Sequence, residues 1–121
     1  MAKRILTVDD SKTMRDMVTF TLKKAGFDVN EAEDGKKALS VLGSGKFDLI
    51  ITDLNMPVMD GISLIKNVRS GSQHRGVPIL ILTTESDGNK KAEGKAAGAT
   101  GWLVKPFSPE KLVELVQRVC P

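Results

Sequence analysis

The sequence predicts an α/β fold, in which a parallel sheet of five strands carries helices on both faces. Two observations support this prediction. Short apolar runs rich in β-branched residues recur along the chain, and such runs are typical of strands covered on both faces. Segments with helical apolar spacing lie between them, so strand and helix alternate five times. This alternation favours parallel strands joined by right-handed helical crossovers.

Four of the five expected strands are apolar throughout. They are Ile5-Leu6-Thr7-Val8, Leu49-Ile50-Ile51-Thr52, Ile79-Leu80-Ile81-Leu82 and Trp102-Leu103-Val104. The remaining strand, Asp28-Val29-Asn30-Glu31-Ala32, alternates polar and apolar residues. Because alternation indicates one solvated face, we expect this strand at an exposed edge of the sheet.

Four of the five expected helices have both an apolar face and a start or stop signal. Ser11 is a plausible N-cap for a first helix, Gly43 a stop for the second, Asp60-Gly61 a start for the third, and Ser108-Pro109 a start for the last. The apolar faces expected for these helices are Met14, Val18, Leu22 and Ala25; Ala38, Leu39 and Leu42; Ile62, Ile65 and Val68; and Leu112, Val113, Val116 and Val119.

The fourth expected helix, Asp87 to Ala97, is the weakest. Gly94 lies in the middle of it, and glycine costs a helix about 1 kcal/mol relative to alanine. We therefore expect this helix to be mobile.

Length and composition indicate one globular domain over residues 1–121. The chain has 18 basic and 15 acidic residues, a net charge of +3, with 40% hydrophobic and 27% charged residues, which excludes disorder, collagen and coiled coil. No apolar run is long enough for a signal peptide or approaches the ~20 residues of a membrane span. The single cysteine, Cys120, has no intramolecular partner. We expect a cytoplasmic protein.

Polar residues collect where the expected strands end. These residues are Asp9-Asp10, Asp53, Thr83-Thr84-Glu85 and Lys105-Pro106. Since the carboxyl ends of parallel strands share one edge, these groups converge there. Three carboxylates placed together repel one another, and carboxylate oxygens suit Mg²⁺, with Mn²⁺ as the alternative. The sequence therefore predicts a divalent cation site.

The chain resembles the receiver domain of two-component response regulators. The resemblance rests on Val8-Asp9-Asp10, Asp53-Leu54-Asn55-Met56-Pro57-Val58-Met59-Asp60-Gly61, Leu82-Thr83-Thr84-Glu85 and Val104-Lys105-Pro106-Phe107, which are in order and at receiver spacing. It spans the whole chain and is nearest to single-domain chemotaxis regulators. It implies the flavodoxin-like strand order 2-1-3-4-5.

The resemblance also implies a role for each residue at the strand ends. Asp53 is the phosphoacceptor, which takes a phosphoryl group from a phosphohistidine of a histidine kinase. Asp10, Asp53 and the backbone carbonyl of Asn55 bind Mg²⁺ directly, and Asp9 binds it through water. Thr83 and Lys105 contact phosphoryl oxygens. The Lys105-Pro106 bond is cis, which aims Lys105 into the site.

The resemblance implies that phosphorylation is coupled to a change at the protein surface, with Thr83 and Trp102 as the switch residues. Tyrosine or phenylalanine is more common at the position of Trp102, and a smaller residue at that of Thr84. The resemblance implies that Asn55 and Glu85 tune dephosphorylation, and we expect the phosphoryl group to be lost fairly fast.

The resemblance places the output surface on the fourth helix, fifth strand and fifth helix. There we expect a flagellar switch protein or another downstream protein to bind a monomer of this chain. Lys90, Lys91 and Lys95 make the region basic, which favours an acidic partner peptide. Nothing outside the receiver pattern indicates nucleic-acid binding.

Other functions remain open at this point. Within the same family, the chain is alternatively a phosphate sink or a phosphorelay intermediate. From another class, an aspartate-nucleophile phosphohydrolase requires an acid where Asn55 stands and threonine or valine where Pro57 stands, so we expect a switch rather than an enzyme. A flavodoxin-like FMN protein needs stacking aromatics, and aromatics are 4% of the chain with no tyrosine.

Overall fold

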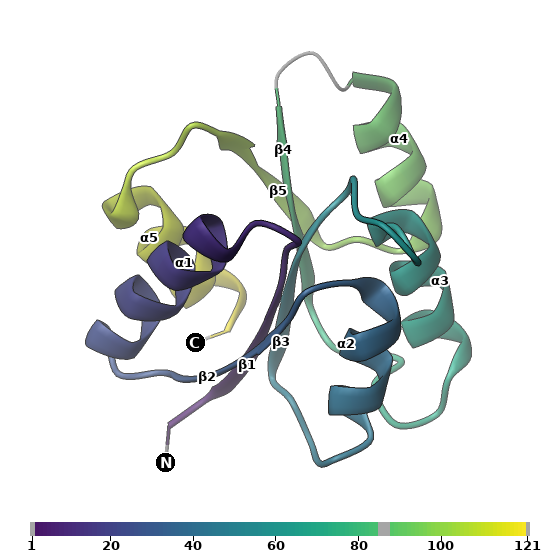
Figure 1. Cartoon of the computed structure of the whole chain (residues 1–121), viewed down its shortest axis with the longest axis horizontal. Helices are drawn as coiled ribbons and strands as arrows, with labels where there is room; N and C mark the ends of the chain where they lie inside the picture. The colour runs from purple at the N-terminus through teal and green to yellow at the C-terminus, as the bar shows by residue number, and fades with distance from the viewer. Residues whose placement is uncertain (1, 85–87, 121) are drawn as a thin grey trace.

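The computed structural model describes residues 2–84 and 88–120 and shows the predicted architecture (Figure 1). One parallel sheet has the strand order β2-β1-β3-β4-β5. The strands are β1 Arg4–Val8, β2 Asp28–Ala32, β3 Leu49–Asp53, β4 Ile79–Thr84 and β5 Gly101–Lys105. The helices are α1 Lys12–Lys24, α2 Gly35–Leu42, α3 Gly61–Ser70, α4 Gly88–Ala97 and α5 Pro109–Val119. The strand order agrees with the one implied by the receiver resemblance.

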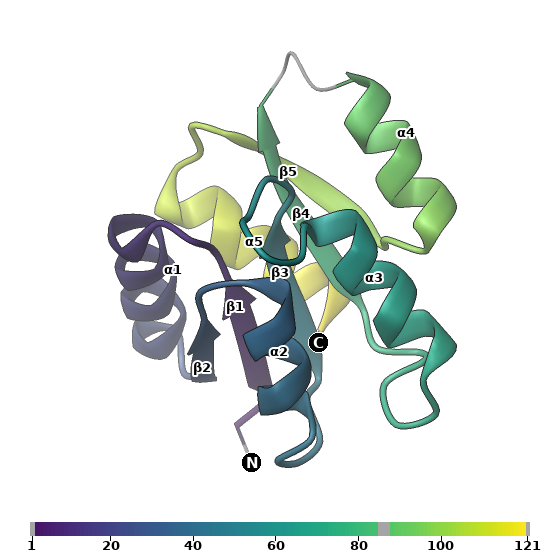
Figure 2. The same ribbon diagram turned by 45° about the vertical axis from the view of Figure 1, so that its right-hand side comes forward.

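The helices form two layers, one on each face of the sheet (Figures 1 and 2). Helices α1 and α5 cover one face, and α2, α3 and α4 cover the other. Successive strand residues supply opposite faces: Ile50 packs with the α2–α4 layer, whereas Leu49 and Ile51 pack with α1 and α5. This explains the apolar runs of β1, β3 and β4, because both faces of these strands are buried. The run in β5 was also expected to be covered on both faces, and this is wrong: β5 is an edge strand, none of its residues is buried, and Trp102 is exposed.

The expected edge strand is at an edge. Strand β2 pairs with β1, is the outermost strand of its side, and buries only Ala32 fully. The alternating pattern of Asp28–Ala32 therefore reflects its position in the sheet.

The start signals identified for three helices act as N-caps. The side chains of Ser11, Asp60 and Ser108 accept hydrogen bonds from backbone N–H groups three residues on, at 3.2, 2.8 and 3.2 Å. Gly43 is the C-cap of α2. Ala25 was expected on the apolar face of the first helix, and this is wrong: the helix ends at Lys24, and Ala25 is an exposed C-cap.

Gly94 has a packing role in α4. It is the buried residue of that helix, and a Cβ atom there would lie 2.4 Å from Cδ1 of Ile81. Glycine thus allows the helix to approach the sheet closely. Asp87, the expected start of this helix, lies outside the described residues. The expected mobility of α4 stays a prediction.

Across residues 2–84 and 88–120, no helix has the length and apolar character needed to cross a membrane.

Candidate functional site

The register of the sheet brings the predicted carboxylates together. Val8 pairs with Thr52, so the residues that follow them, Asp9 and Asp53, leave neighbouring strands side by side. One oxygen from each of Asp9, Asp10 and Asp53 lies within 4.8 Å of the others. The predicted acidic cluster is therefore present at the carboxyl edge of the sheet.

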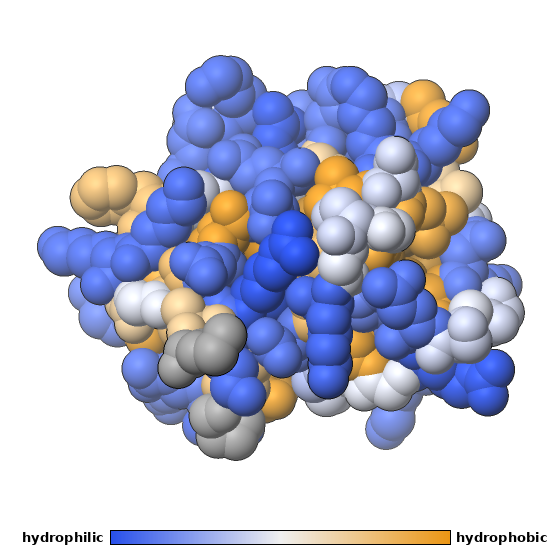
Figure 3. Space-filling view, turned by 90° about the horizontal axis from the view of Figure 1, so that it is seen from below, coloured by the Kyte–Doolittle hydropathy of each residue, from blue (hydrophilic) through white to orange (hydrophobic). Residues whose placement is uncertain are grey.

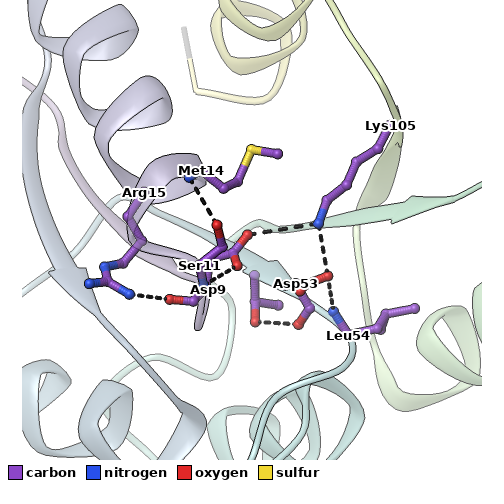
Figure 4. Close-up of polar contacts among 8 residues, drawn as sticks. Asp9, Ser11, Met14, Arg15, Asp53, Leu54 and Lys105 are labelled. Carbon is purple, nitrogen blue, oxygen red and sulfur yellow. Dashed lines mark hydrogen bonds and ion pairs between the residues drawn. The ribbon is translucent and has the colours of Figure 1, made fainter.

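Lys105 reaches this cluster from a strand that is not adjacent to it. Strand β4 lies between β3 and β5, yet Nζ of Lys105 is 3.2 Å from Oδ1 of Asp53 and 3.8 Å from Oδ2 of Asp9 (Figure 4). Its side chain is mostly buried. The Lys105-Pro106 peptide bond is cis. One ammonium group thus faces two of the three carboxylates.

Asp9 is the most deeply buried member of the cluster, with 1% of its surface exposed. Its Oδ1 accepts a hydrogen bond from the N–H of Ser11 at 2.9 Å. Its Oδ2 is buried and accepts no hydrogen bond from the part of the chain that the structure describes. Burial raises the pKa of Asp9, and the charges of Asp53 and Asp10 add to this, against the opposing effects of the Ser11 N–H and Lys105.

Asp53 is held in one orientation but remains accessible. Its Oδ1 accepts hydrogen bonds from the N–H of Leu54 at 2.9 Å and from Nζ of Lys105 at 3.2 Å. Its side chain keeps 15% of its surface exposed, compared with 2% for Asp9. Asp53 is therefore the member of this pair that is open to a reactant from solvent.

The loop between β3 and α3 is packed closely against Asp53. A Cβ atom at Gly61 would lie 2.4 Å from the backbone oxygen of Asp53 and 3.0 Å from Cα of Leu54. Val58 has a φ of 69°, and the N–H of Met59 donates to the carbonyl of Pro57 at 2.7 Å around it. Such a tight turn is costly for a β-branched residue. Asn55, with an exposed side chain, lies in the same loop.

The remaining predicted residues lie along the same edge. Thr83 is 3% exposed at the end of β4, and its hydroxyl donates to the carbonyl of Thr84 at 3.4 Å. Thr84 pairs with Lys105 in the sheet. Glu85 lies outside the described residues.

Trp102 is on the outer surface of β5, with 39% of its surface exposed. Nζ of Lys91, from α4, lies 5.8 Å from the centroid of its ring. The indole is thus a surface group that links α4 to β5, and it is not part of the buried core.

Arg15 is a contact of the site that sequence reasoning missed. Its Nη1 donates to the carbonyl of Asp9 at 2.6 Å (Figure 4). Its Nε lies 3.2 Å from Oε1 of Glu31. A helical arginine soon after two aspartates is an ordinary surface pattern. Only the packing of α1 against β2 shows that it faces the strand ends.

Comparisons with known proteins agree with this fold and site. A model of the response regulator receiver domain family matches residues 5–117. The chain is 41% identical to Chemotaxis protein CheY-3 of Vibrio cholerae over 117 residues, covering 96% of this chain and 90% of that protein. It is 40% identical to Chemotaxis protein CheY of Pseudomonas aeruginosa, with 96% and 94% covered.

Solved structures give the same result. The chemotaxis response regulator CheY4 of Vibrio cholerae superposes with a TM-score of 0.93 at 53% identity, covering 98% of this chain and 99% of that one. A response regulator described as putative, from Chloroflexus aurantiacus, superposes with a TM-score of 0.95 at 36% identity, covering 99% and 98%. The chain belongs to the response regulator receiver domain family. Within it, the similar proteins above include chemotaxis regulators of two-component signalling.

Proposed function

We propose that this chain, over residues 1–121, is a phosphorylatable receiver domain that accepts a phosphoryl group on Asp53 from the phosphohistidine of a histidine kinase. The observation that carries the proposal is the Asp53 carboxylate, which is oriented by Leu54 and Lys105 and remains partly exposed. Family membership supports it. The chain acts as a signalling switch and not as an enzyme that turns over free substrates.

The acidic cluster fits Mg²⁺ or Mn²⁺. Three carboxylates lie within 4.8 Å of one another, and buried Oδ2 of Asp9 accepts no hydrogen bond within the described residues. Lys105 supplies one positive charge, whereas the cluster carries three ionisable carboxylates. Asp10, Asp53 and the Asn55 carbonyl would hold the cation directly, with Asp9 acting through water. When bound, the cation neutralises charge on the transferring phosphoryl group.

The protein's own groups position the reaction. Since the hydrogen bonds from Leu54 and Lys105 go to Oδ1 of Asp53, we assign the attack on phosphorus to Oδ2. An O–P bond forms as the P–N bond to the kinase histidine breaks, and the imidazole nitrogen keeps the electron pair of that bond. Lys105 then turns its ammonium to a phosphoryl oxygen, and Thr83 offers its hydroxyl to another.

The proposed output is a change at the surface of α4, β5 and α5. Thr83 lies on β4, which pairs with β5, and Trp102 on β5 contacts α4 through Lys91. A shift of Thr83 toward the phosphoryl group therefore has a short path to this surface. Because the similar proteins are chemotaxis regulators, we propose a flagellar switch protein as the partner of a cytoplasmic, monomeric protein.

The first test is intact-mass analysis after incubation with acetyl phosphate and Mg²⁺. Wild type should gain one phosphoryl group, and Asp53→Asn should gain none. Asp28→Asn is the matched control, because it removes the same charge from an exposed residue at the other end of the sheet. It should behave as wild type does. An unchanged wild-type mass would refute the proposal, and so would equal labelling of Asp53→Asn.

The second test distinguishes the outputs. Wild type is treated with beryllofluoride, which mimics the phosphoryl group, and is used to capture partners. Asp53→Asn treated in the same way is the control. Beryllofluoride-dependent capture of a flagellar switch protein supports motor regulation. Capture of only a kinase indicates a phosphate sink, and capture of a histidine phosphotransferase indicates a relay.

A further inference from the structure

Arg15 connects three elements at the back of the acidic cluster. It lies in the first turns of α1, hydrogen-bonds the carbonyl at the end of β1, and pairs with Glu31 on β2. Its side chain is 15% exposed, compared with 78% for Lys12 one turn earlier. Arg15 is thus part of the packed structure, whereas Lys12 belongs to the solvated face of α1.

The hydrogen bond from Arg15 to the carbonyl of Asp9 affects both Asp9 and Asp10. That carbonyl belongs to the peptide unit that joins Asp9 to Asp10, and a peptide unit is planar. The N–H of Asp9 is also held, because it donates to the carbonyl of Ala32 at 3.1 Å. Fixing the carbonyl therefore sets the direction in which the chain enters Asp10.

The shape of the guanidinium explains why arginine serves here. Nη1 reaches the Asp9 carbonyl at 2.6 Å while Nε faces Glu31 at 3.2 Å, so one planar group spans an acceptor that directly follows β1 and an acceptor on β2. A lysine ammonium lacks this planar fork and its fixed spacing of donors. Glu31 in turn holds the orientation of the guanidinium.

We propose that Arg15, oriented by Glu31, is a positioning residue that holds the Asp9–Asp10 peptide so that the acidic cluster binds its divalent cation. The inference rests on the proposed function, because it assumes that the cluster takes Mg²⁺. Groups that hydrogen-bond metal ligands typically contribute 10–100-fold to metal affinity. Arg15 acts in the same way through the backbone that carries Asp9 and Asp10.

Simple electrostatics predicts the opposite change in Mg²⁺ affinity when Arg15 is replaced. Arg15 is a cation near a cation site, so removing its charge should by itself tighten Mg²⁺ binding. Positioning predicts weaker binding when the hydrogen bond is lost. The direction of the change therefore separates the two effects.

The test measures Mn²⁺ binding by electron paramagnetic resonance, with Mg²⁺ as competitor, on folded proteins checked by circular dichroism. Arg15→Met should raise Kd at least tenfold. Arg15→Lys, which keeps the charge, should also bind more weakly than wild type, and Glu31→Gln should show a smaller loss. The control Lys12→Met removes a charge from the same helix and should bind as tightly as wild type or slightly more tightly.

Each result bears on one proposal. If wild type fails to bind either ion, the proposed metal site itself fails. If wild type binds and Arg15→Met binds equally or more tightly, the positioning role is overturned while the proposed function stands. Should Arg15→Met not fold, Arg15→Lys and Glu31→Gln decide: wild-type affinity in both overturns the inference.

Discussion

At the scale of single residues, Asp9 is a carboxylate that the fold buries beside two others. Its raised pKa means that the folded protein binds a proton at Asp9 more tightly than the unfolded chain does. The contribution of Asp9 to the free energy of unfolding is therefore fully present below the pKa of the unfolded chain, about 3.8, and is lost as the pH rises through the higher pKa of the folded protein. The ionised form of Asp9 is therefore a cost to folding, which a bound cation would offset.

Replacing Asp9 with asparagine should therefore stabilise the cation-free protein. Asp9→Asn removes the buried charge and keeps an oxygen for the Ser11 N–H. We expect a gain of about 1 kcal/mol in the free energy of unfolding at pH 7 in EDTA, measured by urea denaturation. Added Mg²⁺ should stabilise wild type more than the variant. A less stable Asp9→Asn in EDTA would contradict this account.

His74 is a buried residue at the end of the molecule opposite the acidic cluster. It is 7% exposed, and its Nε2 accepts a hydrogen bond from the N–H of Phe47 at 3.1 Å, which requires the imidazole to be neutral at that nitrogen. Burial lowers the pKa of His74 below 6.5, the hydrogen bond with the Gly45 backbone opposes this, and the charge of Lys46 adds to the lowering. His74 therefore ties the segment before β3 to the segment before β4.

This arrangement predicts a pH dependence of stability. Because the folded pKa is depressed, the unfolded chain binds the proton more tightly, and stability that is present above pH 6.5 is lost as pH falls below it. The slope for one proton is at most about 1.4 kcal/mol per pH unit. Urea denaturation between pH 5 and 8 should show a steeper loss for wild type than for His74→Gln. Parallel profiles would show that His74 does not titrate on unfolding.

At the scale of elements, the β3–α3 loop depends on the absence of a side chain at Gly61. The atoms that a Cβ would meet there are backbone atoms of Asp53 and Leu54, which cannot rotate away. The Gly61 N–H also donates to the Leu54 carbonyl at 2.9 Å. The start of α3 is therefore packed directly against the backbone of Asp53.

Gly61→Ala should destabilise the protein by about 2 kcal/mol, because the overpacked loop has to shift. It should also slow phosphorylation by acetyl phosphate, since the shift moves Asp53. Gly76→Ala is the matched control, because a Cβ there would meet nothing within 4 Å. Urea denaturation and the rate of mass gain measure the two effects. Equal stability of the two variants would show that the loop accommodates the extra methyl group.

A second contact at this scale holds the far end of α4. The guanidinium of Arg69, on α3, donates to the Gly98 carbonyl at 2.9 and 2.8 Å and to the Val77 carbonyl at 2.6 Å. Its burial lowers its pKa. The C-terminal end of α4 is thus tied to α3 and to the segment before β4. Movement of α4 on phosphorylation would have to pivot about this end.

At the scale of the whole molecule, charge is distributed unequally despite the net +3. The acidic cluster occupies the edge at which the strands end. Figure 3 shows the molecule from the other end, where hydrophilic side chains dominate and apolar ones lie between them. The net positive charge of the chain therefore does not predict the charge of the acidic cluster, whose three carboxylates favour a bound cation.

Binding of Mg²⁺ should stabilise the entire fold through linkage. A free concentration of ten times Kd adds about 1.4 kcal/mol, which corresponds to roughly 5 °C in Tm. Thermal unfolding of wild type should show this rise, and Asp10→Asn should show a much smaller one, because the exposed Asp10 contributes little else. Asp28→Asn should respond as wild type does. An identical rise in Asp10→Asn would place the cation elsewhere.

The sequence by itself determined the fold class, the approximate place of each strand and the caps of three helices. It could do so because apolar runs, capping residues and helical spacing are local patterns. It also determined the cluster of Asp9, Asp10 and Asp53, since parallel strands end at one edge. The strand order came from resemblance to the receiver family, whose segments match in order and spacing.

Only the tertiary structure decided the contacts that join distant parts of the chain. Arg15 meets Asp9 and Glu31, and Gly94 fits against Ile81. Trp102 is exposed because β5 is an edge strand. These features depend on strand register and on close packing between elements. No local pattern specifies either, so they appear only when the whole chain is folded.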